Sequence, residues 1–512
     1  MSETGRTWTG FVFMCIGMFM AVLDISVVGS SLTAMESALH IPLDQLSWIQ
    51  TAYLTAEVIA IPLTGWLTRA VSLRRMFVGA TAGFTLASLA CALCASGGPL
   101  IAFRVIQGFC GGMLIPAVFT SVFSILPEKY RTAATAIAGA VAMVAPTIGP
   151  TVGGWLTQTY SWHWIFLINV IPGIVVCTMT AIYLDRGHAE FRLLRAIDYD
   201  TIALSVIFLG TLETLLKEGP EHHWQGALVY GLTAGCTASG AIAIFQSLRH
   251  ANSFVNLRLF RERSFTLACI LSFILGAGLY GSGYLLSIFL GVVRGHTPFE
   301  IGKVLIVSGV AQLIAAPIAA FAETRIDGRL VMGVGFCLFA AGLLINSGAS
   351  VNTDFDGLFW PQVLRGASVM LCIIPMMKLA LDGWNEDDTT DVSGLFNLTR
   401  NLGGAIGIAL IDTIVESRTP QHARALGKAL EAGSADAARI VGLPTQYFHG
   451  QNMGPGTADM RAFVEPLIQR AALNEAFDDA WIAMGALFLL ALLLVPLSRW
   501  AKGHIAREAR VH

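Results

Sequence analysis

Long runs of apolar residues dominate the chain, and short polar segments separate them. A bilayer core of about 30 Å requires about 20 apolar residues of α-helix, so a run of this length predicts a membrane span. Fourteen such runs lie near residues 11–33, 46–68, 76–96, 100–126, 132–156, 163–184, 199–217, 227–248, 266–291, 301–322, 330–349, 358–381, 393–416 and 478–500. We therefore expect an all-α integral membrane protein with 14 transmembrane helices.

The composition narrows the class further. Charged residues make up 13% of the 512 residues and hydrophobic residues 55%, before 52 glycines are counted, whereas an average soluble protein has about 25% charged residues. The net charge is −2 and no basic stripe occurs, which excludes a nucleic-acid-binding protein. A soluble enzyme and a disordered chain are excluded by the same shortage of charge.

Basic residues are distributed unequally between the two sides of the expected helices. With a cytoplasmic N-terminus, 19 of the 32 Lys and Arg residues fall in inside segments, and only three fall in short outside loops. Short cytoplasmic loops carry the excess of Lys and Arg in membrane proteins. We expect both termini to be cytoplasmic and the segment of about 417–477 to lie outside.

A weak internal repeat divides the chain into halves. Arg104-Val-Ile-Gln-Gly108 in one half resembles Gln362-Val-Leu-Arg-Gly366 in the other, and a glycine pair follows in the next expected helix of each half. Repeats of this kind are typical of secondary transporters, whose substrate site lies between the halves. We expect a six-helix bundle over 1–198, two inserted helices and a cytoplasmic loop over 199–263, and a second six-helix bundle over 264–512.

Charged side chains inside the expected spans are candidates for proton coupling, because each costs about 2.5–3.5 kcal/mol at the bilayer centre. Asp24 lies past the middle of its helix, Glu57 is near the centre of the next, and Arg104 is early in a third. Tyr53 precedes Glu57 by one helical turn on the same face. The alternative is that Asp24 and Glu57 form ion pairs that only hold helices together, and that Arg104 only anchors its helix.

Further polar positions are candidates for substrate binding or coupling. Asn397 and Arg400 form a polar patch in the span of residues 393–416, and Asp412 lies near its outer end. Gln107 and Gln362 occupy the two copies of the repeated motif.

Glycine and proline are expected to set the conformational behaviour of the span of residues 132–156. Proline removes a backbone donor and kinks a helix, and glycine allows a neighbouring helix to approach closely. Gly149, Pro150, Gly153 and Gly154 predict a kinked helix with a smooth face, and Gly108 marks a second close contact. The alternative is a tightly packed span that does not move.

Enzymatic chemistry is not supported by the motifs present. The chain has no H-E-x-x-H, G-x-x-x-x-G-K-[ST] or G-x-S-x-G pattern, so zinc hydrolysis, ATP-driven pumping and serine hydrolysis are unsupported. We expect a non-enzymatic protein without catalytic residues, metal or other cofactor. A membrane-embedded transferase is the alternative of another class, and it would require polar catalytic clusters in loops at one membrane face.

Several motifs together carry a family resemblance. The first span contains Leu23-Asp24-x-Ser26, and a later one contains Arg104-x-x-Gln107-Gly108. Gly149-Pro150-x-x-Gly153-Gly154 follows, and then the segments Ser161 to Asn169 and Ser393 to Gly404. These segments resemble the major facilitator superfamily, in particular its 14-helix drug:proton antiporter branch of the EmrB/QacA type.

The resemblance implies a function and partners. It implies proton coupling through the Arg104 motif and an antiporter signature at Gly149 to Gly154. The loop after the second span departs from the family pattern, because Arg69 replaces the usual acid and Ser72 the second glycine. EmrB-like members share this loss, and they work with a periplasmic adaptor (membrane fusion) protein and an outer-membrane channel.

The sequence thus predicts a proton-driven multidrug exporter of amphipathic or aromatic compounds, whose partners are protons, small substrates and the lipid bilayer. The alternative within the same class is export of an endogenous metabolite such as a siderophore or a fatty acid. The segment of 417–477 is long for a connection between helices. Residues 422–443 and 462–474 within it favour helices, and a break is expected at residues 450–456. The segment is expected either to dock the adaptor or to be a tolerated insertion.

Overall fold

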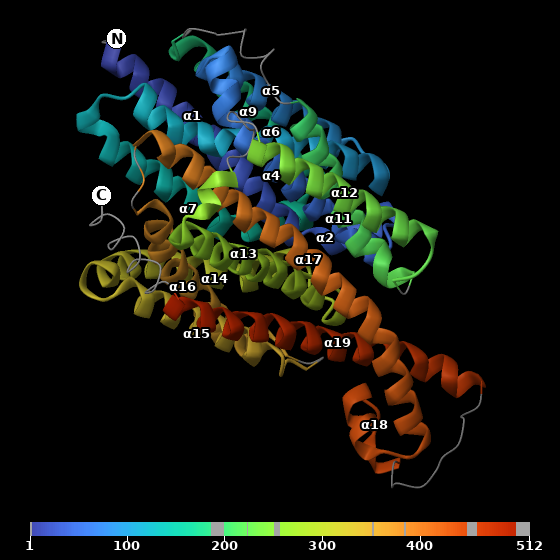
Figure 1. Ribbon diagram of the computed structural model, residues 1–512. Coiled ribbons are helices and arrows are strands. Elements are labelled where there is room, and N and C mark those ends of the chain that lie inside the picture. The colour runs from blue at the N-terminus through green and yellow to red at the C-terminus, as the bar shows by residue number, and fades with distance from the viewer. Residues whose placement is uncertain are drawn as a thin grey trace.

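The computed structural model describes residues 3–185, 199–222, 224–249, 257–350, 353–382, 384, 386–447 and 458–497. These residues form helices joined by short connections, and no β-strand occurs among them. The all-α fold class predicted from the apolar runs is therefore confirmed. Figure 1 shows two packed groups of helices and a small helical extension around α18.

The helices follow the expected order. The first part of the chain contains α1 (Glu3–Gly29), α2 (Leu32–Leu39), α3 (Leu43–Leu46), α4 (Trp48–Val71), α5 (Leu73–Ala92), α6 (Gly97–Ser124), α7 (Glu128–Thr159), α8 (Trp164–Leu167) and α9 (Val170–Tyr183). The next are α11 (Tyr199–Glu221), α12 (Ala227–Arg249), α13 (Arg263–Ile288), α14 (Pro298–Arg325), α15 (Gly328–Asn346) and α16 (Phe355–Leu381). The chain continues through α17 (Glu386–Glu431), α18 (Ala435–Val441) and α19 (Ala458–Leu494).

Twelve helices in the described part of the chain are long and apolar enough to cross a membrane. The other two expected spans coincide with α4 and α11, which have 24 and 23 residues. At a rise of 1.5 Å per residue, either helix is long enough for a bilayer. The structure is thus consistent with fourteen spans.

Two hydrophobic cores hold the helices together. One is centred on Phe11, Phe77 and Phe84 and is built by α1, α4, α5, α6, α7 and α9. The other joins α13 to α17 and α19, and it extends to residues such as Val27 and Leu46 near one end of the first bundle. The two bundles therefore share a continuous apolar core at the end of the molecule where α2 lies.

The repeated sequence motif corresponds to a repeated helix contact. A Cβ placed on Gly108 of α6 would overlap the backbone of Tyr53 in α4, and one placed on Gly366 of α16 would overlap the backbone of Ser308 in α14. Glycine is required at both places because the two backbones are in contact. The equivalent packing of α6 on α4 and of α16 on α14 agrees with the repeat read from the sequence.

The two bundles meet along α7 and α14. Thr151 Oγ1 donates to the carbonyl of Gly302 at 3.2 Å, and Thr147 Oγ1 donates to the carbonyl of Gly309 at the same distance. Closer to the α2 end, Gly154 lies against the backbone of Pro298. This series of contacts closes the interface between the bundles at that end.

The long polar segment forms a compact helical cap. α17 runs 46 residues without interruption and α19 runs 37, so both extend beyond the length that a bilayer requires. Their extensions pack with α18 around Leu426, Leu430, Val441 and Ile468, as Figure 1 shows at its lower right. The break expected at residues 450–456 lies outside the described residues.

Hydrogen bonds attach the cap to the C-terminal bundle and join its two long helices. Arg470 Nε donates to the carbonyl of Val293 at 2.7 Å. His422 Nε2 lies 2.9 Å from Asp479 Oδ2 and joins α17 to α19. Gly291, close to Val293, lies against Thr33 of α2, so the cap and α2 are at the same end of the molecule.

Candidate functional site

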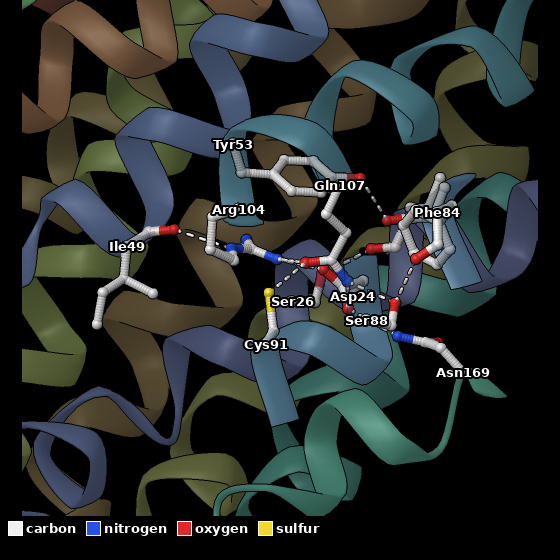
Figure 2. Close-up of polar contacts among 12 residues, drawn as sticks. Asp24, Ser26, Ile49, Tyr53, Phe84, Ser88, Cys91, Arg104, Gln107 and Asn169 are labelled. Atoms are coloured by element: carbon white, nitrogen blue, oxygen red, sulfur yellow. Dashed lines mark hydrogen bonds and ion pairs between the residues drawn. The ribbon is translucent and has the colours of Figure 1, made fainter. Parts of the chain in front are cut away.

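Asp24 and Arg104 form an ion pair in the centre of the first bundle, and both side chains are fully buried. Asp24 Oδ2 accepts from Arg104 Nη1. Asp24 Oδ1 accepts from Gln107 Nε2 at 2.9 Å and from Asn169 Nδ2 at 2.7 Å. Figure 2 shows how α1, α6 and the residue before α9 bring these groups together.

The guanidinium of Arg104 is held by further contacts. Its Nε donates to the carbonyl of Ile49 at 3.0 Å, and its Nη1 donates to Gln107 Oε1 at 2.8 Å. The ring of Tyr53 lies 4.3 Å from the guanidinium carbon, within the range of a cation–π contact. Gln107 Nε2 also donates to Ser88 Oγ at 2.8 Å, which links the network to α5.

Close packing of α4 on α6 allows this geometry. Gly108 and Gly111 of α6 lie against the backbone and the hydroxyl of Tyr53, and Gly112 lies against the backbone of Glu57. Any side chain at these glycines would push α4 away from α6. Tyr53 and Glu57 are thereby fixed next to Arg104 on consecutive turns of α4.

The network is an electrostatically balanced unit. Burial of an isolated charge is costly, and removal of one partner of a buried pair leaves the other charge uncompensated. Protonation of Asp24 would have this effect on Arg104. Loss of the Asp24 charge would therefore disfavour the present packing of α1 on α6.

Glu57 belongs to a second group of polar residues, located where the two bundles meet. Its side chain is beside Asn401 and within electrostatic reach of Arg400, both on α17. Glu57 is 1% exposed, and its Oε2 has no hydrogen-bond partner in the described structure. The carboxylate thus lies across the bundle boundary from Arg400, and it is also within electrostatic reach of Arg104 of the Asp24 network.

The α17 side of this boundary is organised by its own hydrogen bonds. Arg400 Nη2 donates to Asn397 Oδ1 at 2.7 Å, and Tyr280 OH donates to Asn401 Oδ1 at 3.4 Å. We call Glu57, Tyr280, Asn397, Arg400 and Asn401 the boundary cluster. It contains one acid and one base on opposite bundles, so its net attraction depends on the protonation of Glu57.

The other polar residues singled out from the sequence lie apart from these two groups. Asp412 Oδ1 accepts from Tyr284 OH at 2.8 Å, near the α2 end. Gln362 is fully buried in α16, and neither of its amide atoms has a hydrogen-bond partner in the described structure.

The glycine motif of α7 faces two directions. Gly149 and Gly153 lie against Ser26 and Val27 of α1, within the same bundle. Gly154 lies against Pro298 of α14, in the other bundle. Pro150 is inside the continuous helix α7, and its carbonyl lies against Gly302. Only part of the motif therefore forms the contact between bundles.

Sequence reasoning did not select Asn169, Ser88 and Tyr280 as site residues. Asn169 lies at the junction of α8 and α9, where an amide in an apolar run was the available signal. Ser88 and Tyr280 are common residue types inside apolar helices, and the sequence alone carries no signal for their contacts.

Comparison with known proteins identifies the class. The sequence profile of the Major Facilitator Superfamily matches residues 14–408. The chain belongs to this superfamily and is a multi-pass membrane transporter.

Individual relatives place it within the EmrB type, as the resemblance implied. "Colistin resistance protein EmrB" of Acinetobacter baumannii is 34% identical over 97% of each chain. "Multidrug export protein EmrB" of Escherichia coli is 30% identical over 94% of each chain. "Fatty acid resistance protein FarB" of Neisseria gonorrhoeae is 29% identical over 80% of each chain.

Solved structures support the fold. A bacterial homologue of the human lysosomal transporter Spinster, in an inward-facing and unoccupied conformation, has a TM-score of 0.64 at 13% identity and covers 97% of each chain. A structure described under substrate recognition in proton-dependent oligopeptide transporters has a TM-score of 0.63 at 11% identity, over 97% of this chain and all of the other.

Proposed function

We propose that this protein is a proton-driven exporter of amphipathic, often aromatic compounds across the bacterial inner membrane. The observation that carries the proposal is the boundary cluster, in which the buried Glu57 of one bundle lies beside Asn401 of the other and within electrostatic reach of Arg400. Neutralising Glu57 weakens the attraction between the bundles at the level where substrate sites of such repeats lie. The export relatives named above support the direction of transport.

The driving force is sufficient for this task. One proton crossing about 100 mV releases about 2.3 kcal/mol, and each pH unit adds about 1.36 kcal/mol. Together these values support a gradient of several hundredfold for a neutral substrate. In this scheme Asp24 carries the proton beside Arg104, and Glu57 links protonation to the separation of the bundles.

The proposed mechanism requires a defined membrane orientation and two bundles that move relative to each other. Both termini are cytoplasmic, and the α2 end with the cap is periplasmic, so the contacts of α7 with α14 close the outer side. Residues 1–198 form one moving bundle and 264–512 the other. The segment 199–263 joins them, and α11 packs beside α17 through Thr413 Oγ1, which donates to the carbonyl of Leu216 at 3.2 Å.

Replacing Glu57 with glutamine tests this scheme. Glu57→Gln keeps the shape and removes the charge facing Arg400, so dye efflux from energised cells should fall about tenfold, a cost of about 1.4 kcal/mol. The residual efflux should no longer respond to an uncoupler. The measurement is the efflux rate with and without uncoupler at equal protein level.

Asp185→Asn, which neutralises an exposed carboxylate outside both the site and the cap, is the control and should transport normally. Efflux that keeps its full uncoupler sensitivity in Glu57→Gln would contradict the coupling role. A variant that fails to fold would instead identify a purely structural contact.

We further propose that the cap docks a periplasmic adaptor protein, which continues the route to an outer-membrane channel. The cap supports this because it has its own core and projects from the bundle, as an independent docking element would. Replacing residues 424–469 with a short Gly/Ser linker should leave transport in proteoliposomes intact and strongly reduce whole-cell resistance. Unchanged resistance in cells would show that the cap is dispensable and would remove the docking role.

Export of an endogenous fatty acid is a second candidate, favoured by the FarB relative. The two candidate functions are distinguished in cells that lack the chromosomal gene, compared with and without a plasmid that carries it. Protection against long-chain fatty acids, without protection against aromatic dyes, would favour the second candidate.

A further inference from the structure

The repeated motif differs between the bundles in a way that changes its chemistry. In α6 the order is Arg104 then Gln107, and in α16 it is Gln362 then Arg365, each pair followed by glycine. The arginine and the glutamine have exchanged places, and each pair lies on one helix face at a spacing of three residues. Both copies are buried in their bundles.

The surroundings of the two arginines differ more than their order. Arg104 is paired with Asp24 and hydrogen-bonded to Gln107 and Ile49. Arg365 is 4% exposed. The one hydrogen bond of its side chain in the described structure is from Nη1 to the carbonyl of Ser282 in α13, at 3.5 Å. Within the residues that the structure describes, no carboxylate lies within 4.0 Å of its guanidinium.

Gln362, one helical turn before Arg365, also lacks polar partners. It is fully buried, and both its Nε2 and its Oε1 are without a hydrogen-bond partner in the described part of the chain. A buried amide normally satisfies both groups. A guanidinium without a carboxylate partner and an amide without hydrogen bonds, one helical turn apart, therefore form a site with positive charge and free hydrogen-bonding capacity.

From these observations we propose that Gln362 and Arg365 form a binding site for the anionic group of an organic acid. A guanidinium matches a carboxylate through two parallel hydrogen bonds, and the Gln362 amide can donate a further one. The incoming anion supplies the charge that Asp24 supplies in the first bundle. As a substrate site this inference rests on the proposed export function, but the binding itself does not.

Two surfactants of equal chain length and opposite charge test the site. Purified protein in phosphatidylcholine nanodiscs, without any gradient, is titrated with radiolabelled dodecanoate and with dodecyltrimethylammonium, and empty nanodiscs give the background. The wild-type protein should prefer dodecanoate. Arg365→Gln should weaken dodecanoate binding about 10- to 100-fold, as expected for hydrogen bonds to a charged group, and should leave binding of the cation unchanged.

Gln362→Glu provides the matched variant in case Arg365→Gln does not fold. It places an internal carboxylate one turn from Arg365, so it should abolish the preference for dodecanoate without lowering the melting temperature. Equal binding of both surfactants by the wild-type protein would overturn the inference, and so would a preference that survives both substitutions.

A chloride titration separates the two sources of negative charge. If chloride raises the melting temperature through Arg365 while dodecanoate binding is insensitive to Arg365→Gln, the site takes inorganic anions only and the inference is overturned. Proton-driven transport in proteoliposomes is measured separately. Intact dodecanoate binding without gradient-driven transport would contradict the proposed function but not this site. Gradient-driven transport without dodecanoate binding would contradict this site but not the proposed function.

Discussion

Asp24→Asn is expected to abolish proton-driven transport and to destabilise the protein. Asparagine preserves the size of the side chain but removes the charge that compensates Arg104. Loss of one partner of a buried ion pair costs about 3–5 kcal/mol in soluble proteins, so the melting temperature should fall. The measurements are gradient-driven dye transport in proteoliposomes and thermal unfolding of the purified protein.

A double variant separates stability from coupling. Combining Asp24→Asn with Arg104→Gln removes both charges and should recover much of the lost stability, but it should not recover transport. Asp185→Asn is the control, because that residue is exposed and its contact with Arg6 measures 3.9 Å at the surface. Transport restored in the double variant would mean that the pair only holds α1 against α6.

Gly154→Leu should block transport by preventing closure of the bundles at the α2 end. Its side chain would meet the backbone of Pro298 in the other bundle, and backbone cannot move aside as a side chain can. Overpacking typically costs about 1–3 kcal/mol. We expect near-complete loss of transport in proteoliposomes with protein that still inserts and folds.

Two other glycines of α7 provide comparisons for this variant. Gly139 has no atom within 4 Å of an added Cβ, so Gly139→Leu should be silent. Gly153→Leu would strike α1 within the same bundle, and it should mainly lower the melting temperature. Equal effects of all three substitutions would show that helix α7 tolerates or rejects leucine regardless of which bundle it faces.

Helix positions were predictable because membrane spans are set by length and hydropathy, which depend on local sequence. The main difference concerns the polar segment, where α17 and α19 continue as helices and enclose a core around Leu430 and Ile468. The alternation of apolar and charged residues in this segment favours helices. The length of the segment alone does not indicate that α17 and α19 extend out of the bilayer together.

The sequence indicated single site residues, but it did not indicate which of them are in contact. A charge in an apolar run marks Asp24, Glu57 and Arg400, but their partners depend on how the helices pack. Glu57 and Arg400 are far apart in the sequence, and no pattern indicates that they face each other. The pairing of Asp24 with Arg104 is likewise a product of three-dimensional packing.

The continuity of α17 has a mechanical consequence. From Arg400 at the bundle boundary to Glu431 in the cap, the helix has 31 steps and measures about 46 Å at 1.5 Å per residue. Because the cap is attached to the same bundle through Arg470, it turns with that bundle as one body. A tilt of about 10° moves the tip by about 8 Å over such an arm. Each transport cycle would thus appear outside the bilayer as a displacement of the cap, large enough for a neighbouring protein to sense.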